Sequence, residues 1–335
     1  MRELLRRHRK VILALTLPYV LILFLLTYRI DYRIYTPGDL NPVENFIEFE
    51  ESHPQKNPLH TIYIMNVEQP TFFQFMVSYF TDAHTIDKLP ESRQNVSDRA
   101  SFESGQVSRN TSVDLAVIAA YDALGLEVDY ETEYIVSLYY DYMDNDELDI
   151  GDVILSVNDD EDVIDALNAV ECEDKATLRV RKEDGEEATY EITKQERDDR
   201  CTFGLNVSTY YNIQDAEIPY TVKDSLIGGP SGGLMQTLYI YNALSEEDLT
   251  EDTVIAGTGS IRADGTVGSV GGVREKVWTA HKRDVDVFFV PEGTNHDAAL
   301  EAEREIGGTG MTIVEVETFD DALEYLKGEG ANGSN

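Results

Sequence analysis

The stretch from Gly228 to Met235, Gly-Gly-Pro-Ser-Gly-Gly-Leu-Met, decides how the C-terminal part of this sequence is interpreted. Apolar residues at Leu234 and Leu238 continue it at helical spacing, which predicts a helix over 232–244 with Ser231 at its amino end. Small neighbours leave the Ser231 hydroxyl open to a substrate. A serine that only caps a helix gives the same pattern, so this motif alone does not establish a catalytic role.

The amide groups beside Ser231 are candidate donors to an oxyanion, because N–H groups at a helix start face outward. Pro230 has no N–H, so the donors are expected to be Ser231 itself and a flanking glycine, Gly229 or Gly232.

A second glycine-led motif runs from Gly271 to Val277, Gly-Gly-Val-Arg-Glu-Lys-Val. Val273, Val277 and Ala280 mark the buried stripe of the helix that follows, and Lys276 lies beside that stripe. Burial would lower the pKa of Lys276, and a neutral lysine can take the proton of a serine hydroxyl. A solvated surface lysine is the competing interpretation, and it is the commoner one.

Together the two motifs resemble the catalytic core of Lon-type Ser–Lys proteases, most specifically over residues 226–291. The resemblance implies Ser231 as nucleophile, Lys276 as base and a supporting role for Thr258. It implies an α/β fold with a mixed sheet and helices, to which the strand at 60–67 and the helix at 112–124 would also belong. Many Lon proteases carry an acidic residue where this chain has Gly228.

The sequence opens with a basic segment followed by an apolar one. The run Val11–Tyr28 is uncharged, follows Arg2, Arg6, Arg7, Arg9 and Lys10, and lacks a small-residue cleavage site after it. It predicts an uncleaved transmembrane anchor with the N-terminus in the cytoplasm and the rest of the chain outside. With this anchor and a PDZ-like block, the whole chain resembles the YlbL-like branch of membrane-tethered Lon-type peptidases.

The PDZ-like block is predicted from residues 148–158, where the run L-x-x-G-D-x-I-L-x-V-N resembles the second half of a PDZ domain. A short helix at 163–170 and strands at 176–181 and 187–193, joined by a turn at 184–185, follow it. PDZ domains bind an extended peptide by strand addition. The usual carboxylate-binding loop is missing, and the nearest stretch is Glu133–Val136; a β-rich insertion without a ligand is the alternative.

The sequence thereby predicts the following organisation: a cytoplasmic basic tail at 1–10, a transmembrane anchor at 11–28, a stalk and extracytoplasmic segment at 29–127 (of which 60–125 can belong to the protease fold), a PDZ-like domain at 128–197, a Lon-type proteolytic domain at 198–328, and a disordered tail at 329–335. Residues 82–112 are polar and are expected to be rich in loops. Alternating strands and helices after Cys201 end in a helix at 319–327, for which Thr318 is a good N-cap.

The composition and the absence of certain motifs argue against several classes of ligand. With 27 Lys+Arg against 64 Asp+Glu, a formal net charge of −37 argues against a nucleic-acid ligand. No G-x-x-x-x-G-K-[ST] occurs, so no ATP site is expected, and the histidine and cysteine spacings indicate no zinc site. The acidic run 141–152 is interpreted as a solvated surface rather than a calcium loop. Cys172 and Cys201 are either a single disulfide or two free thiols.

The expected function is therefore ATP-independent cleavage of exported or membrane-tethered proteins or peptides, without a cofactor, by a Ser231–Lys276 dyad. Two alternatives stay open. Gly229–Gly233 also fits the G-x-S-x-G elbow of serine hydrolases, for which Asp286 and His296 can be nominated as partners. An anchored PDZ scaffold with an inactive protease domain is the other alternative, and the oligomeric state is not indicated.

Overall fold

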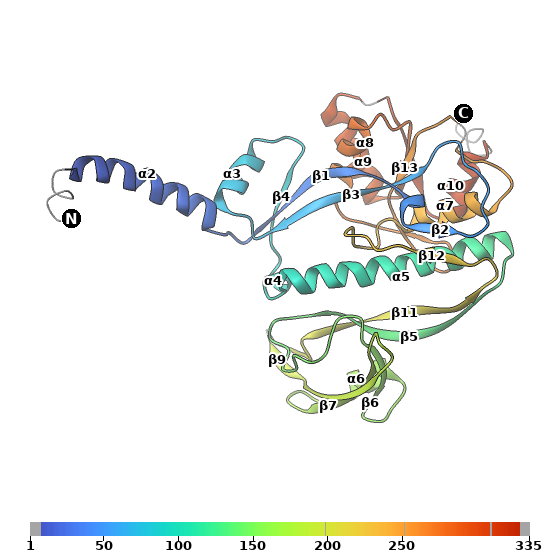
Figure 1. Ribbon diagram of the computed structural model, residues 1–335, viewed down its shortest axis with the longest axis horizontal. Helices are drawn as coiled ribbons and strands as arrows, with labels where there is room; N and C mark the ends of the chain where they lie inside the picture. The colour runs from blue at the N-terminus through green and yellow to red at the C-terminus, as the bar shows by residue number, and fades with distance from the viewer. Residues whose placement is uncertain (1–7, 198, 251, 309, 329–335) are drawn as a thin grey trace.

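The computed structural model describes residues 8–197, 199–250, 252–308 and 310–328. A helix projects from an α/β body, and a smaller β-rich unit is joined to that body by a long two-stranded ribbon (Figure 1). Residues 1–7 of the predicted basic tail and the predicted tail at 329–335 lie outside the described residues.

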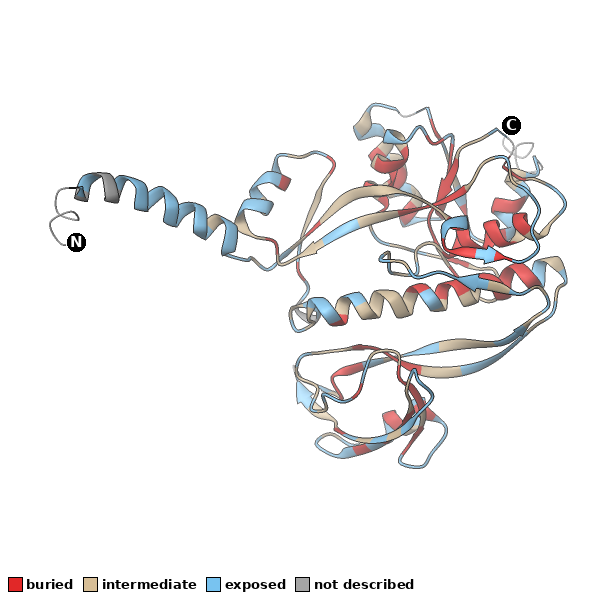
Figure 2. Cartoon of the chain, viewed as in Figure 1, coloured by how far each residue is buried: buried red, intermediate tan, exposed pale blue. Residues whose placement is uncertain are grey.

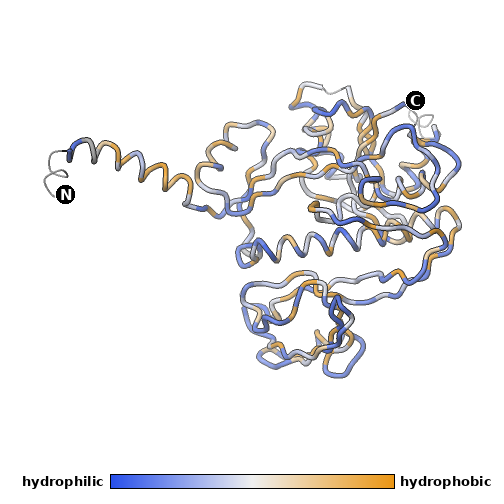
Figure 3. Tube along the Cα trace, in the orientation of Figure 1, coloured by the Kyte–Doolittle hydropathy of each residue, from blue (hydrophilic) through white to orange (hydrophobic). Residues whose placement is uncertain are grey.

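The projecting helix α2 spans Arg9–Thr27 and contains Pro18. Its described residues are mostly exposed, as the colours of Figure 2 show, and many of them are hydrophobic, as those of Figure 3 show. In the part of the chain that the structure describes, however, no helix combines the length and the apolarity needed to cross a bilayer. The predicted transmembrane anchor at 11–28 is therefore not supported.

A six-stranded mixed sheet forms the centre of the body, in the order β17-β16-β13-β3-β1-β4. The strands β3, β13, β16 and β17 run parallel, whereas β1 and β4 are antiparallel to their neighbours. Their bounds are β1 Tyr32–Pro42, β3 Leu59–Glu68, β4 Thr85–Lys88, β13 Ile255–Gly257, β16 Val287–Pro291 and β17 Thr312–Val316. The expected mixed α/β fold is confirmed, but residues 32–42, predicted as part of a stalk, are a strand of this sheet.

Helices cover both faces of the sheet. Successive side chains of a strand point to opposite faces, and β16 has apolar side chains on each face that must be buried. Phe289 packs in one core cluster and Phe288 in the other, and both are fully buried. The first cluster involves α5 (Asp98–Leu124), α7 (Gly233–Leu244) and α10 (Phe319–Leu326), and the second involves α8 (Val273–Lys282) and α9 (Thr294–Ile306). Thr318 caps α10 as predicted, since its side chain accepts from the N–H of Asp321.

The helix α5 is longer than the sequence predicts. It begins at Asp98, where Ser97 caps it by accepting a hydrogen bond from the N–H of Ala100, and it ends at Gly125 in a left-handed conformation. Its first half is polar and lacks a continuous apolar stripe, so the expectation of loops over 82–112 was wrong for this part. The rest of that region contains β4 and the short helix α4 (Glu91–Gln94), after α3 at Phe72–Tyr79.

The β-rich unit has its own sheet, in the order β11-β5-β6-β7-β8, and its own core. Its elements are β5 Val128–Tyr139, β6 Val153–Val157, α6 Val163–Ala169, β7 Lys175–Arg181, β8 Glu187–Thr193 and β11 Leu205–Ala216, with a small hairpin of β9 (Gln195–Arg197) and β10 (Arg200–Thr202). The predicted turn at 184–185 joins β7 and β8. Glu133–Val136 lies inside β5, which is paired on both sides, so this stretch is not a carboxylate-binding loop.

Two short strand pairs complete the described part of the body. The strand β12 (Tyr220–Val222) pairs with β2 (Ile47–Phe49), which follows the 3-10 turn η1 at Val43–Asn45. The strands β14 (Ser260–Ile261) and β15 (Val267–Gly268) form a hairpin whose turn contains Asp264 and Gly265.

A disulfide joins Cys172, just after α6, to Cys201 in β10, which answers the question that the sequence left open. The bridge spans 29 residues of sequence. Because a cross-link restricts the unfolded chain, replacing both cysteines by serine should lower the free energy of unfolding of the β-rich unit by about 2–4 kcal/mol.

Urea denaturation followed by circular dichroism, with and without dithiothreitol, checks this prediction. The reductant should destabilise the natural chain and leave the double-serine variant unchanged. Equal stability of the natural chain in both conditions contradicts it.

Candidate active site

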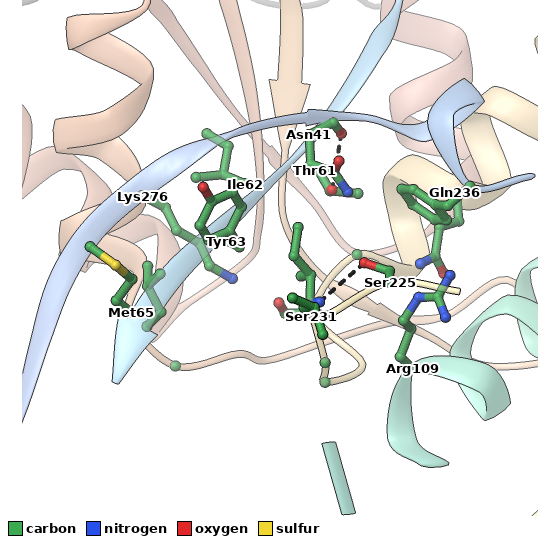
Figure 4. Close-up of a pocket in the computed structure, with 18 of the residues that line it drawn as sticks. Asn41, Thr61, Ile62, Tyr63, Met65, Arg109, Ser225, Ser231, Gln236 and Lys276 are labelled. Carbon is green, nitrogen blue, oxygen red and sulfur yellow. Dashed lines mark hydrogen bonds between the residues drawn. The ribbon is translucent and has the colours of Figure 1, made fainter. Parts of the chain in front are cut away.

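A cavity of ≈ 580 Å³ brings the two glycine-led motifs together at the end of β13. The strand β13 pairs with β3 at Leu59, His60 and Thr61. Beyond Thr61, β3 continues without β13 along that edge. Residues 61–65 of β3 form one wall, and residues 225–229 and 231–232 form the other. Figure 4 shows Lys276 and Ser231 on facing sides, with the Lys276 amine pointing toward Ser231.

Ser231 immediately precedes the N-cap of α7, as the sequence predicts. Its carbonyl oxygen accepts hydrogen bonds from the N–H of Gly259 and from the hydroxyl of Thr258, both at 3.0 Å. Its own hydroxyl has no hydrogen-bond partner among the described residues. The backbone of the serine is thus fixed to the end of β13, and its side chain faces the cavity without a competing partner.

Some of the backbone N–H groups around Ser231 already donate a hydrogen bond within the protein, and others do not. The N–H of Gly229 donates to the carbonyl of Gly105 at 2.7 Å, so it cannot also serve an oxyanion. The N–H groups of Ser231 and Gly232 donate to none of the described residues. Of the two flanking glycines, Gly232 is therefore the available donor, while Gly229, with φ +94°, shapes the turn.

Position 228 requires a glycine because its backbone lies very close to α5. A Cβ at this position would lie 2.8 Å from the carbonyl carbon of Gly105, which is backbone that cannot move aside. The acidic residue that many Lon proteases carry here does not fit in this chain, because the helix occupies its space.

Lys276 lies in the first turns of α8 and is 1% exposed. Its Nζ donates a hydrogen bond of 2.7 Å to Oγ1 of Thr258. Burial lowers the pKa of Lys276 to about 7, an effect that the neighbouring Glu275 carboxylate partly opposes. At neutral pH a large fraction of this amine is uncharged and carries a free lone pair, as a general base requires.

Thr258 links the two motifs. It is fully buried, and its Oγ1 accepts from Lys276 and donates to the Ser231 carbonyl. No hydrogen bond directly joins the Ser231 hydroxyl and the Lys276 amine within the described residues. Catalytic contacts of this kind commonly tighten only when substrate binds. Thr258 holds the amine at a fixed place relative to the serine backbone.

Three further contacts come from segments that local sequence patterns do not connect with the motifs. The single hydroxyl proton of Ser112 in α5 is shared between the carbonyl of Pro230, at 3.2 Å, and the side-chain oxygen of Gln236, at 3.0 Å, which supports the turn before Ser231. The hydroxyl of Thr85 in β4 donates to the buried carboxylate of Glu275. These pairs are separated by more than a hundred residues, so no spacing rule identifies them.

The alternative serine-hydrolase triad is not assembled. His296 contacts Glu315 at 2.9 Å, and Asp286 accepts a hydrogen bond from the backbone N–H of Val254. Neither residue lines the cavity that contains Ser231, and no histidine is among the described residues that line it.

Comparison with known proteins gives an independent result for the same part of the chain. Residues 213–327 match the Lon protease (S16) C-terminal proteolytic domain. The chain is 33% identical over 123 residues to the Lon protease of Campylobacter jejuni and 34% identical over 127 residues to that of Clostridioides difficile. It is 35% identical over 121 residues to the Lon protease of Dictyoglomus thermophilum.

These matches cover 36%, 38% and 36% of this chain, but only 14%, 16% and 15% of the three relatives. The chain thus spans about one seventh of the length of the curated relatives that it matches. Ser231, Thr258 and Lys276 all fall within the matched segment. The segment from residue 213 to residue 327 is therefore similar to the proteolytic domain of Lon proteases.

Proposed function

We propose that this protein is a serine endopeptidase in which Ser231 is the nucleophile and Lys276 the general base. The observation that carries the proposal is the burial of the Lys276 amine across the cavity from an unpartnered serine hydroxyl. Outside a specialised site, a lysine without an ion-pair partner would not be buried in this way, because desolvation of its charge is costly.

The geometry supports the following sequence of steps. The neutral Lys276 amine takes the proton of the Ser231 hydroxyl as Oγ attacks the substrate carbonyl. The N–H groups of Ser231 and Gly232 donate to the oxyanion that forms. The ammonium of Lys276 then returns its proton to the departing amine, the C–N bond breaks, and an acyl-enzyme remains. Water, deprotonated by the same amine, hydrolyses the ester.

We also propose that the enzyme works without ATP and outside the cytoplasm. The sequence contains no G-x-x-x-x-G-K-[ST] motif for nucleotide binding, and the Cys172–Cys201 disulfide is of the kind that persists in oxidising surroundings. An enzyme without a motor acts on segments that are already extended, so flexible or unfolded proteins are the proposed substrates.

The proposal assigns the β-rich unit to peptide binding in the manner of a PDZ domain. A second cavity of ≈ 490 Å³ lies between α6 and residues 205–208 of β11, and β11 is the edge strand of its sheet. Phe203 and Leu205 also line it, with Gly204 between them at φ +75°. A free strand edge beside a helix suits strand addition, and we assign the peptide-binding loop to 203–205 rather than to 133–136.

The experiment is digestion of unfolded casein by the full chain, compared with Ser231→Ala and Lys276→Ala. Lys282→Ala is the matched control, because Lys282 is exposed on the same helix. We expect both site variants to be inactive and the control to retain full activity. Cleavage by Ser231→Ala at the natural rate would overturn the proposal, and binding of unfolded protein without cleavage by any form would favour a scaffold instead.

The pH dependence of the reaction follows from the base. Because only the neutral Lys276 amine accepts a proton, and its pKa is about 7, the rate should rise roughly tenfold per pH unit in acid and level off above pH 7. Hydrolysis of a quenched fluorescent peptide between pH 5 and 9 measures it, with circular dichroism as the control for folding. A flat profile across this range contradicts lysine as the base.

A further inference from the structure

Arg109 of α5 is a buried cation in the wall of the active-site cavity. Its side chain is 6% exposed, and its guanidinium lies 5.3 Å from the ring centroid of Phe46. One Nη atom donates to the carbonyl of Lys223 at 2.8 Å and the other to the side-chain oxygen of Asn110 at 3.3 Å. Figure 4 shows Arg109 rising from α5, with its guanidinium beside Gln236 in this view.

This guanidinium lacks a carboxylate partner. Among the described residues, no Asp or Glu oxygen lies within ion-pair distance of it. Asp224 is near enough to raise the pKa of Arg109, but burial acts in the opposite direction and is the larger effect. A guanidinium stays charged in proteins and has five N–H donors, so two hydrogen bonds to neutral oxygens leave it incompletely satisfied.

The composition of the cavity wall is the second, independent observation. Asp and Glu make up 64 of the 335 residues, yet none of the described residues that line this cavity is acidic. Arg109 and Lys276 are the charged types in that wall, and the reaction requires Lys276 to be neutral. In a protein with a net charge of −37, the cavity is therefore a place of local positive charge.

We propose that Arg109 binds a carboxylate of the substrate and so makes the peptidase selective for peptides that carry a carboxylate near the cleaved bond. The inference rests on the proposed function. Arginine recognises a carboxylate through charge-assisted hydrogen bonds, which are about twice as strong as neutral ones. The carboxylate is either the side chain of Asp or Glu or the free C-terminus of the peptide, and the two sources differ in the test below.

A purely structural role is the competing explanation. Through the Lys223 carbonyl, Arg109 also holds the segment that leads from β12 to the Ser231 turn. Loss of that contact would weaken binding and cleavage of all peptides by a similar factor. Loss of a carboxylate contact would instead change the ratio between acidic and neutral peptides, so this ratio distinguishes the two roles.

The experiment measures binding to the full chain with the nucleophile removed by Ser231→Ala. Fluorescence anisotropy compares otherwise identical peptides with both ends blocked, in which one Glu or one Gln is moved through each position. A second arm compares a neutral peptide with a free C-terminus and its amide. About 1 M salt screens the long-range repulsion between acidic peptides and this acidic protein, whereas a buried pair is screened much less.

In one of the two arms we expect the carboxylate peptide to bind about ten- to thirtyfold more tightly than its neutral partner. The arm in which this happens shows whether Arg109 binds an acidic side chain or a free C-terminus. Adding Arg109→Gln should remove the preference, and Arg109→Lys should retain part of it. Arg99→Gln is the matched control, because Arg99 is exposed on the same helix and pairs with Glu103. Equal binding of acidic and neutral peptides to Ser231→Ala, or no binding of either, overturns the proposal.

A preference that survives Arg109→Gln also overturns the proposal, as does an equal loss of binding for both peptides. The melting temperature of each variant separates a folding defect from a binding defect, and Arg109→Lys tests the charge if Arg109→Gln fails to fold. Because binding is read without hydrolysis, this result does not depend on cleavage by the natural chain. Failure of the casein experiment alone would overturn the proposed function and leave the carboxylate site standing.

Discussion

Replacing Lys276 by methionine should abolish proteolysis and, at the same time, make the protein more stable at neutral pH. Removal of the base should lower kcat by about 10³-fold or more. The stability gain arises because the buried amine is costly to protonate: its pKa is about 7 in the folded protein against 10.5 for a free lysine. Allowing for the lost hydrogen bond to Thr258, the gain is about 2–4 kcal/mol.

The free energy of unfolding should also depend on pH in a defined direction, which offers a second measurement of the same effect. Below pH 7 both folded and unfolded chains carry the proton on Lys276, and the cost of the buried charge is complete. Between pH 7 and 10.5 the unfolded chain binds more protons, so the natural protein gains stability as pH rises. Urea titrations should therefore show the advantage of Lys276→Met shrinking over this window. A methionine variant less stable than the natural chain at pH 7 contradicts the account.

Adding one methyl group to Gly228 should damage the enzyme far more than adding one to its contact partner Gly105. The new Cβ at residue 228 meets backbone at 2.8 Å, which forces the Ser231 turn and α5 apart. We expect Gly228→Ala to lose about 1–3 kcal/mol of stability and about 10²-fold in kcat/KM, because small displacements of a nucleophile are costly.

Gly105→Ala is the matched control for this prediction. Its Cβ would lie 3.6 Å from the nearest atom of Gly228, an ordinary contact, and alanine is favoured over glycine inside a helix by about 0.5–1 kcal/mol. The variant should be fully active and at least as stable as the natural chain. Thermal melts and peptide hydrolysis of both variants test the asymmetry, which an equal effect of the two substitutions would refute.

The C-terminal part of the molecule was predictable because its signals are local. The helix after Ser231, the helix over 273–282 and the capped helix after Thr318 each follow from residues within a few turns. The apolar stripe beside Lys276 indicated that its amine could be buried, but a solvated surface lysine fitted the same local pattern. For the same reason the turn between β7 and β8 could be placed from its Asp-Gly pair.

The remaining features depend on contacts between distant segments. The first half of α5 has no apolar stripe of its own, yet it carries Gly105, which packs against Gly228, and Arg109, which lines the cavity. The strand β1 was interpreted as part of a stalk because residues 30–58 contain Pro, Asn and Glu, and only its pairing with β3 and β4 makes it a strand. A single sequence contains no signal for such pairings.

The most direct test of this account is the ionisation of Lys276 itself. Lysine labelled with ¹³C at Cε and ¹⁵N at Nζ, followed by NMR from pH 5 to 11, reports each amine, and Lys276→Met assigns the signal. We expect this one amine to titrate near pH 7, well below the 10.5 of a free lysine. An amine at residue 276 that stays protonated above pH 10 would contradict the proposed mechanism.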